Sequence, residues 1–338
     1  MTGIVKICIC GGGGLGHTCA AVLSSHDGVE VMLYTQHPEQ WNHHFVVDDS
    51  NGKQYQGRLT KISNQAENVI PHADIVLLCL PAYLVEKTLT TIKPHLSSST
   101  IVGSVVGNTG FFLFAHEIFS DKPVGLFAFQ RVPFISRVAE YGKKALLLGY
   151  KKDLLIATEN ISQKQDFCNQ ISKLFCTPTS LVDSFYEVTL SNSNPILHTG
   201  RLYAMWRNWD GKQYANIPLF YNDWTNETSE IIIQMDKEFF GLLNKLNVST
   251  LHLPTLLEYY EVNDAASLTQ KIKSIPAFAN ILSPMKPLSD GWIPDFDSRY
   301  FTEDFPFGLR FIYELAHKYD VDCPIIDKVY NWGIGKIK

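Results

Sequence analysis

The chain has 338 residues, of which 45% are hydrophobic and 19% are charged, and its formal net charge at pH 7 is −5. This composition is ordinary for a globular protein with a sizeable core, and the length favours two domains over one. The acidic balance argues against a nucleic-acid partner, because no basic cluster is dense enough to form an electrostatic footprint.

The sequence predicts neither a membrane partner nor a metal site. The longest strongly apolar run, residues 73–85, contains Asp74 and Pro81 and is shorter than a membrane span. No charged and then apolar leader is expected, because four glycines interrupt the first apolar segment. The seven cysteines are odd in number and lack the paired spacing of zinc ligands, and no other cluster has ligand spacing. We therefore expect reduced thiols and a cytoplasmic protein.

In chain order, the N-terminal segment predicts a βαβ unit. Residues 4–10 read IVKICIC, a strand rich in β-branched residues. A glycine cluster separates this strand from a small-residue helix over 15–25, and a second strand follows over 29–35. A crossover of this kind implies that the two strands are parallel.

The remaining elements divide the chain into a mixed half and a helical half. Residues 45–59 predict an inserted hairpin, because Asn51-Gly52 is a strong turn signal. Beyond about residue 185 the strand signals fade, so a domain boundary is expected at 183–190. Before it, strands are predicted at 74–80, 100–106, 126–129 and 145–150, and helices at 84–92, 111–119 and 163–175. After it, helices are predicted at 195–208, 227–246, 268–274 and 305–319.

The glycine cluster satisfies the G-x-G-x-x-G pattern directly after a strand and at the start of a helix. In that pattern the first glycine allows a tight turn and the second lets the backbone approach a pyrophosphate. The third lets the helix pack closely on the sheet. A purely structural glycine turn is the alternative. We predict a dinucleotide-binding loop whose contacts with the cofactor come from Gly11, Gly13, Gly14, Leu15 and Gly16.

The end of the second strand bears on the choice between NAD and NADP. An NAD-binding domain usually places Asp or Glu there to bind the ribose 2′-hydroxyl. Here the strand end reads YTQH over residues 34–37, with no acidic residue before Glu39 and no arginine. No carboxylate repels a 2′-phosphate, and Thr35, Gln36 and His37 can hydrogen-bond it. The sequence therefore favours NADP(H) over NAD(H).

Together these features predict an α/β fold class. We expect an N-terminal Rossmann-type doubly wound sheet followed by a mainly α-helical domain, as in the 6-phosphogluconate-dehydrogenase-like fold. In this interpretation residues 1–186 are the NAD(P)-binding domain and residues 187–338 are the helical substrate and catalytic domain. The predicted protein is an NAD(P)-dependent oxidoreductase.

The first candidate catalytic segment is residues 191–198, which read SNSNPILH. Ser193 or Asn194 can cap a helix, and Pro195 suits the first turn of that helix. His198 then lies about one turn inside. An imidazole can donate and accept a proton near neutral pH, as the reduction of a carbonyl or imine requires. A structural histidine on an amphipathic helix is the competing interpretation.

The second candidate segment is residues 297–306, which read DSRYFTEDFP and lead into the predicted helix at 305–319. Its charged side chains include Arg299 and Asp304. Taken in isolation, a helix cap and a solvated loop would explain these charges without any chemistry.

The NP-x-x-H motif of residues 194–198 and the RYFTED stretch of residues 299–304 resemble those of the octopine/nopaline (opine) dehydrogenases. The resemblance covers most of the chain and includes the glycine loop and residues 107–111 and 131–137. It also includes the strand end at residues 80–82, where Leu80 and Pro81 would contact the cofactor.

The resemblance implies hydride transfer from NAD(P)H to the imine formed between an amino acid and a 2-oxo acid, which gives a secondary-amine dicarboxylate. It implies a proton relay between His198 and Asp304, and substrate binding by Arg299 and Tyr300. Arg299 would hold a substrate carboxylate through its planar fork. The partners are then the two small-molecule substrates, and a homodimer is a candidate assembly.

Two other functions stay open at this point. A 2-oxo-acid reductase similar to ketopantoate reductase would act on a C=O bond. Such enzymes usually place a lysine on the first long helix of the second domain, and residues 191–210 contain none. A non-catalytic dinucleotide sensor would keep the fold without turnover. The joint presence of His198, Arg299 and Asp304 counts against the sensor.

Overall fold

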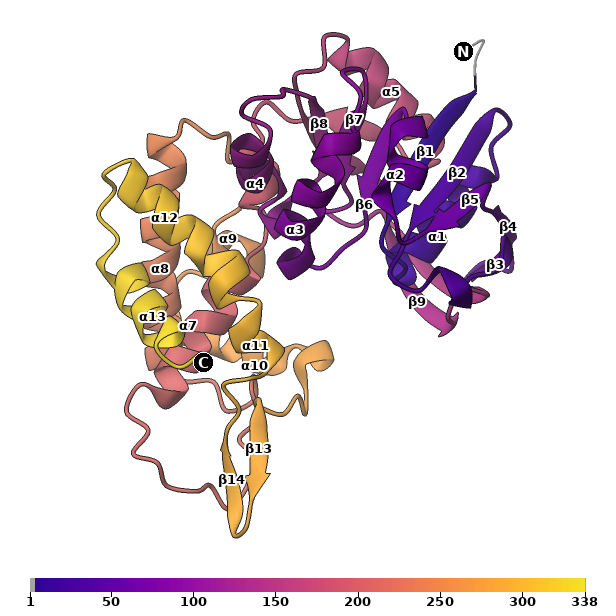
Figure 1. The fold of residues 1–338 in the computed structure, drawn as a ribbon. Coiled ribbons are helices and arrows are strands. Elements are labelled where there is room, and N and C mark those ends of the chain that lie inside the picture. The colour runs from indigo at the N-terminus through magenta and orange to yellow at the C-terminus, as the bar shows by residue number, and fades with distance from the viewer. Residues whose placement is uncertain (1–3, 338) are drawn as a thin grey trace. The chain divides into compact units, whose positions relative to one another are not determined.

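The computed structural model describes residues 4–337 and shows two compact units (Figure 1). The first unit ends at Thr189 and the second begins at Leu190. None of the described helices combines the length and the apolar character that a membrane span requires. All seven cysteines are free, and six of them are buried.

A mainly parallel sheet of eight strands forms the centre of the first unit. The strands are β1 (Val5–Cys10), β2 (Val29–Tyr34), β5 (Lys61–Ser63), β6 (Ile75–Leu78), β7 (Ile101–Ser104), β8 (Gly125–Phe129), β11 (Leu154–Glu159) and β12 (Thr179–Leu181). Their order is β12-β11-β8-β7-β6-β1-β2-β5, and every neighbouring pair is parallel except β8 with β11. All four residues of β6 are buried, as expected for a parallel strand covered on both faces. This arrangement confirms the predicted α/β fold.

The order of the sheet reverses beside β1. The chain builds one side through β2 and β5 and then crosses to the other side at β6. Doubly wound sheets bind their ligands at the carboxyl ends of the strands where the order reverses. A ligand is therefore expected beside the segments that follow β1, β2 and β6.

A second sheet of four strands, in the order β4-β3-β10-β9, lies in the same unit. Its strands are β3 (His44–Asp49), β4 (Gln54–Arg58), β9 (Phe134–Glu140) and β10 (Lys144–Tyr150). The predicted hairpin over 45–59 is confirmed, with Gly52 at a φ of 84°. The sequence did not predict β9, or that the strand at 145–150 pairs with this hairpin. Most of β9 is exposed, so its sequence lacks the apolar alternation of a half-buried strand.

The helices of the first unit pack on these sheets. Nine of the eleven residues of α1 are buried, because α1 contacts strands of both sheets. Its small side chains, such as Ala20 and Ala21, allow that close packing. The helices are α1 (Gly14–Ser24), α2 (Ala66–Val69), α3 (Ala82–Ile92), α4 (Phe111–Ile118), α5 (Lys164–Leu174) and α6 (Tyr186–Thr189).

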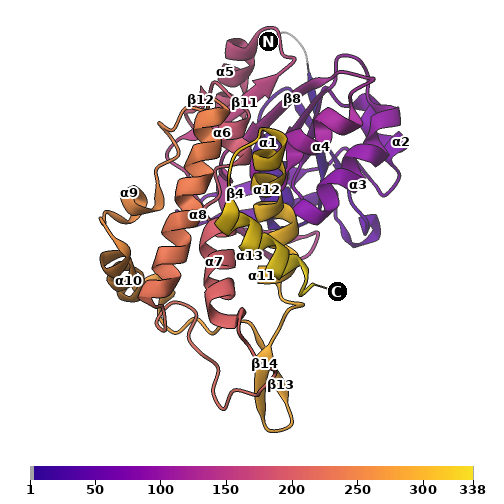
Figure 2. The ribbon, with the colours of Figure 1, turned by 90° about the vertical axis from the view of Figure 1, so that its left-hand side faces the viewer.

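The second unit is mainly helical, as the sequence predicted. Its helices are α7 (Asn194–Trp206), α8 (Asn226–Lys245), α9 (Leu256–Tyr260), α10 (Ala265–Ser274), α11 (Arg299–Thr302), α12 (Arg310–Lys318) and α13 (Pro324–Ile334). Helices α7 and α8 lie side by side (Figure 2). A Cβ at Gly200 would lie 2.6 Å from Ile232 Cγ1, so this glycine allows the close crossing. A short hairpin, β13 (Met285–Leu288) and β14 (Gly291–Pro294), was not predicted.

The predicted helix over 305–319 is wrong at its start. Residues Phe305–Leu309 form a π-helical turn, and the α-helix α12 begins only at Arg310. A Cβ at Gly308 would lie 2.6 Å from Pro195 Cγ, so the turn packs closely against the first turn of α7. An apolar period of 3.6 residues cannot reveal one wider turn, and such turns are frequent at functional sites.

A buried carboxyl group in α8 makes the stability of this protein depend on pH. Burial raises the pKa of Asp236 to about 6, although its hydrogen bond from the Leu256 N–H lowers it. The Asp236 carboxyl therefore binds more protons in the folded protein than in the unfolded chain between about pH 4 and pH 6. We expect the contribution of this group to the free energy of unfolding to fall by about 3 kcal/mol as pH rises through this window. Denaturant titrations at several pH values should show a smaller fall for Asp236→Asn and an unchanged one for the exposed Asp290→Asn.

Candidate functional site

A pocket of about 310 Å³ lies in the first unit where β1, β2 and β6 end. The glycine turn after β1, the residues after β2 and the start of α3 line it. No carboxylate is among its lining residues in the described part of the chain. The pocket thus lies at the reversal point of the sheet, where a nucleotide is expected.

The glycine turn has the geometry that its sequence predicted. Gly11 has a φ of +118°, and a Cβ there would lie 2.5 Å from the Cys79 carbonyl oxygen. A Cβ at Gly16 would lie 2.0 Å from the Gly11 carbonyl oxygen, so only glycine lets α1 pack this closely on the turn. Gly13 is exposed, and its Cβ position is open. The backbone can therefore approach a pyrophosphate there.

The other predicted loop residues lie next to the pocket but do not line it. Gly14, Leu15 and Gly16 form the first turn of α1, and the Leu15 side chain packs against the core. The first N–H groups of a helix have no partner within that helix. Any contact of these residues with a cofactor would therefore come from the backbone.

A buried histidine that the sequence did not single out ties the turn to the second sheet. The Gly142 N–H donates to His17 Nε2 at 2.9 Å, so Nδ1 carries the proton and donates to the Gly13 carbonyl oxygen at 2.9 Å. Burial lowers the pKa of His17, although its backbone hydrogen bonds oppose this shift. A neutral His17 therefore links the glycine turn to the β9–β10 turn.

The predicted side chains at the end of β2 lie in the pocket. Thr35, Gln36 and His37 all line it, and the Thr35 hydroxyl lies 3.3 Å from the Tyr141 hydroxyl. Leu80 and Pro81 also line it. Sequence reasoning missed Tyr141, and it missed the exposed Lys87 of α3, whose ammonium makes no ion pair among the described residues. The pocket thus has a positive group and no lining carboxylate.

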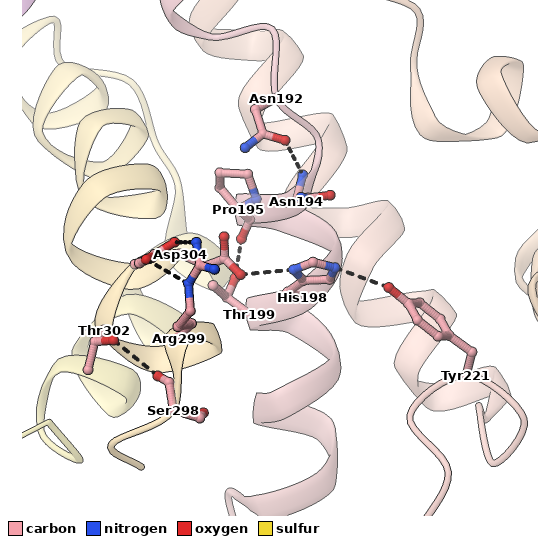
Figure 3. Close-up of polar contacts among 11 residues, drawn as sticks. Asn192, Asn194, Pro195, His198, Thr199, Tyr221, Ser298, Arg299, Thr302 and Asp304 are labelled. Atoms are coloured by element: carbon pink, nitrogen blue, oxygen red, sulfur yellow. Dashed lines mark hydrogen bonds and ion pairs between the residues drawn. The ribbon is translucent and has the colours of Figure 1, made fainter. Parts of the chain in front are cut away.

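The second unit brings His198 and Asp304 together (Figure 3). His198 Nδ1 lies 2.8 Å from Asp304 Oδ2, and both side chains are largely buried, at 13% and 18% exposure. His198 Nε2 lies 3.1 Å from the hydroxyl of Tyr221, a residue that the sequence did not single out. An imidazole held on one side by a carboxylate can move a proton at its other nitrogen.

Local structure fixes the two partners of this pair. Helix α7 begins at Asn194 with Pro195 in its first turn, but the side chain of Ser193 makes no capping bond. The Asn192 side-chain oxygen instead accepts from the Asn194 N–H at 3.1 Å. Asp304 directly precedes the π-helical turn, and its carbonyl accepts from the Leu309 N–H at 2.8 Å.

The two predicted substrate-binding residues lie in α11, beside the pair. The Tyr300 ring packs edge-on against His198, with 4.9 Å between ring centroids. The Arg299 guanidinium pairs through Nε and Nη2 with both oxygens of Glu303, each at 2.8 Å. The Arg299 side chain is 82% exposed. Its fork is therefore accessible, and a carboxylate already occupies it.

One group in the described residues has metal-ligand types, although the sequence predicted none. His317, Cys323 and Asp327 place their ligand atoms within 4.8 Å of one another. The three side chains satisfy one another, because His317 pairs with Asp327 at 2.9 Å and the Cys323 thiol donates to the same carboxylate at 3.3 Å. These two contacts hold the three side chains together.

Known proteins match both units. Residues 181–335 match the family described as NAD/NADP octopine/nopaline dehydrogenase, alpha-helical domain, and residues 7–107 match the family described as ketopantoate reductase PanE/ApbA. The chain is 27% identical to octopine dehydrogenase from Mizuhopecten yessoensis, over 98% of this chain and 90% of the relative. It is 28% identical to tauropine dehydrogenase from Arabella iricolor, over 98% of this chain and 91% of the relative.

A solved structure extends the similarity to three dimensions. Octopine dehydrogenase with NADH and L-arginine matches with a TM-score of 0.86 at 27% identity, covering 98% of this chain and 89% of the other. The chain is therefore similar to opine dehydrogenases over nearly its whole length. This confirms the family resemblance, and the protein is an NAD(P)-dependent enzyme of the opine dehydrogenase type.

The residues of the first unit fit an NAD(P) cofactor. The tight turn at Gly11, the open Gly13 and the first turn of α1 form a loop to which a pyrophosphate can bind. The ketopantoate reductase match ends at residue 107 and so concerns the first unit alone. His198, Tyr221 and Asp304 all lie within the segment that matches the octopine/nopaline family.

Proposed function

We propose that this protein condenses an amino acid with a 2-oxo acid and reduces the resulting imine to a secondary-amine dicarboxylate. The observation that carries the proposal is the hydrogen-bonded pair of His198 and Asp304 in a unit that matches the octopine/nopaline family. The similar octopine dehydrogenase has been solved with NADH and L-arginine, which supports an amino acid as one substrate class.

His198 is the proposed proton donor. When bound, the nicotinamide cofactor supplies the hydride. Reduction of the imine also needs a proton at nitrogen, and His198 supplies it from Nε2. Asp304 accepts the Nδ1 hydrogen at 2.8 Å, so it holds the ring and stabilises the imidazolium form. Solvent then restores the proton to the imidazole.

Arg299 is the proposed binding group for the carboxylate of the 2-oxo acid. Its fork can hold a carboxylate through two parallel hydrogen bonds, as it holds Glu303 in this structure. A bound substrate carboxylate would replace that of Glu303 in the same geometry. The Tyr300 ring, which packs on both His198 and Phe220, would form an apolar side of the site.

The proposed cofactor is NADP(H) in preference to NAD(H). The solved octopine dehydrogenase contains NADH, so family membership does not decide between the two. The support comes from the pocket of this chain, which has Lys87 and His37 in its lining and no carboxylate among its described lining residues. A 2′-phosphate would find the Lys87 ammonium there and no carboxylate among the described lining residues, although Glu39 lies 3.4 Å from His37 Nδ1.

Lys87 gives this cofactor preference a direct test. We expect Lys87→Met to raise the KM for NADPH about tenfold, because a hydrogen bond to a charged group is lost. The KM for NADH should stay unchanged, since NADH lacks the 2′-phosphate. Lys93→Met is the matched control, because Lys93 pairs with Asp121 and does not line the pocket. Equal changes for both cofactors, or a wild-type preference for NADH, would contradict the proposal.

A coupled assay tests the function itself. The protein is mixed with NADPH or NADH, pyruvate or another 2-oxo acid, and each member of a panel of amino acids, and absorbance of the reduced cofactor is followed. Oxidation only when both substrates are present is the expected result. Oxidation with the 2-oxo acid alone would instead establish a carbonyl reductase. Cofactor binding without turnover on any pair would establish a dinucleotide sensor.

A further inference from the structure

His198 has a second hydrogen-bond partner besides Asp304, and this partner faces the nitrogen that has to move a proton. The Tyr221 hydroxyl lies 3.1 Å from His198 Nε2 (Figure 3). Because Asp304 accepts from Nδ1, a neutral His198 has its lone pair at Nε2, and the Tyr221 hydroxyl donates to it. When His198 becomes doubly protonated, the same hydroxyl can rotate and accept from Nε2–H.

The Tyr221 ring is held firmly although it belongs to a connection between helices. The residue is 5% exposed. Its ring stacks on Phe278 with 4.1 Å between centroids and an interplanar angle of 15°. It also lies nearly parallel to the ring of Trp224, at 5.9 Å and 9°. The hydroxyl is therefore presented to His198 by a ring that has little freedom to turn away.

A buried arginine on the same helix as His198 fixes the backbone of that connection. Arg201 is 3% exposed and lies three residues after His198 in α7. Its Nε donates to the Phe220 carbonyl at 2.9 Å, and Nη2 donates to the carbonyls of Asp223 at 3.0 Å and Leu219 at 3.4 Å. These carbonyls lie on both sides of Tyr221 in the chain.

The burial of this guanidinium needs an explanation. Its described hydrogen bonds go to backbone carbonyls and to the Thr228 hydroxyl, and none goes to a carboxylate. Burial lowers the pKa of Arg201 to about 10, and the Asp223 carboxylate opposes this shift. Burial of a charge without a hydrogen-bonded counter-ion is costly. The carbonyls that Arg201 binds are those around Tyr221. Its burial is therefore associated with ordering of the backbone at Tyr221.

We propose that Tyr221 is a positioning residue for the proton transfer at His198 Nε2, and that Arg201 holds Tyr221 in place. The proposal rests on the proposed function. Tyr221 holds the imidazole ring in one orientation while His198 alternates between its neutral and doubly protonated forms. The Nε2–H is shared between the Tyr221 oxygen and the bound substrate nitrogen. Its proton passes to that nitrogen, and Tyr221 keeps its own proton throughout. Arg201 acts only through the position of Tyr221.

A double-mutant cycle with Tyr221→Phe and Arg201→Met tests this arrangement. Tyr221→Phe removes one oxygen atom and should lower kcat about tenfold, with the KM for the 2-oxo acid changed by less than about twofold. Arg201→Met should lower kcat to a similar degree. The double variant should be no slower than Arg201→Met alone, because the two residues act through one hydrogen bond. The pH midpoint of kcat/KM should shift in the same direction in both single variants.

Arg207→Met is the matched control. Arg207 follows α7 directly, but its described side-chain bonds go to the Ala204 carbonyl and to Glu227, and not to the carbonyls around Tyr221. It should leave kcat and the pH midpoint unchanged. A wild-type kcat and pH midpoint in Tyr221→Phe would overturn the proposal. If the fold-losses in kcat of the two single variants multiply in the double variant, Arg201 does not act through Tyr221. If Arg201→Met does not fold, Tyr221→Phe still decides.

The variant His198→Ala distinguishes a failure of the proposed function from a failure of this inference. If His198→Ala keeps full activity, the role of His198 is lost and the role of Tyr221 falls with it. If His198→Ala is inactive and Tyr221→Phe keeps the wild-type kcat and pH midpoint, only the positioning role is wrong.

Discussion

Replacing His198 with alanine should lower kcat by about 100-fold or more, which is the usual scale for the loss of a general acid. The imidazole is the only group that the proposed reaction uses to protonate the substrate nitrogen. The KM for NADPH should stay near its wild-type value, because the pocket that would bind the cofactor is built entirely from residues of the first unit. Steady-state kinetics with both substrates saturating measures the change.

The second unit offers a closely matched control for this variant. His317 pairs with Asp327 at 2.9 Å through Nε2, whereas His198 pairs with Asp304 through Nδ1, and the His317 side chain is 50% exposed. His317→Ala should leave kcat unchanged. If both histidine variants lose activity equally, the loss reflects stability, and thermal unfolding would show it. An unchanged kcat in His198→Ala would remove His198 from the chemistry.

Replacing Arg299 with lysine should raise the KM for the 2-oxo acid by about tenfold or more, with little effect on the KM for the cofactor. Lysine keeps the charge but loses the planar fork that binds a carboxylate through two hydrogen bonds. Glu303→Gln should act in the opposite direction and lower the same KM. The Glu303 carboxylate occupies the fork in this structure and would compete with the substrate.

A second arginine in the same unit provides a matched control for Arg299→Lys. Arg310 pairs with Glu314 at 2.7 Å over the same spacing of four residues. Arg310→Lys should leave the kinetics unchanged. If Arg299→Lys raised only the cofactor KM, Arg299 would belong to the nucleotide site. A higher KM for the 2-oxo acid in Glu303→Gln would show that Glu303 orients Arg299 and does not compete with the substrate.

The nucleotide pocket shows which features a sequence can reveal. The glycine turn was predictable because its requirements are local: a strand, a positive φ at Gly11 and a close contact at Gly16 are all encoded within a few residues. Lys87 and Tyr141 were not, because they reach the pocket from α3 and from the β9–β10 turn. No local pattern links these positions to the glycine turn.

The helical unit shows a different limit. The pairing of His198 with Asp304 joins residues far apart in the chain, and it was expected from a family resemblance and not from spacing. Tyr221 stayed hidden because an aromatic residue between helices usually belongs to the core. Its contact with His198 depends on the bonds that Arg201 makes to backbone carbonyls, and a backbone carbonyl leaves no signature in a sequence.

The parallel pairing of β3 with β10 has a consequence for how the protein is made. Lys144 to Leu147 align with Val46 to Asp49, so one small sheet joins segments about a hundred residues apart. Strand pairing over such a separation is slow compared with local folding. The turn that carries Tyr141 and Gly142 directly precedes β10. A ribosome therefore has to synthesise the chain beyond β10 before the wall of the nucleotide pocket can close, and a nascent chain that stops earlier should not retain the cofactor.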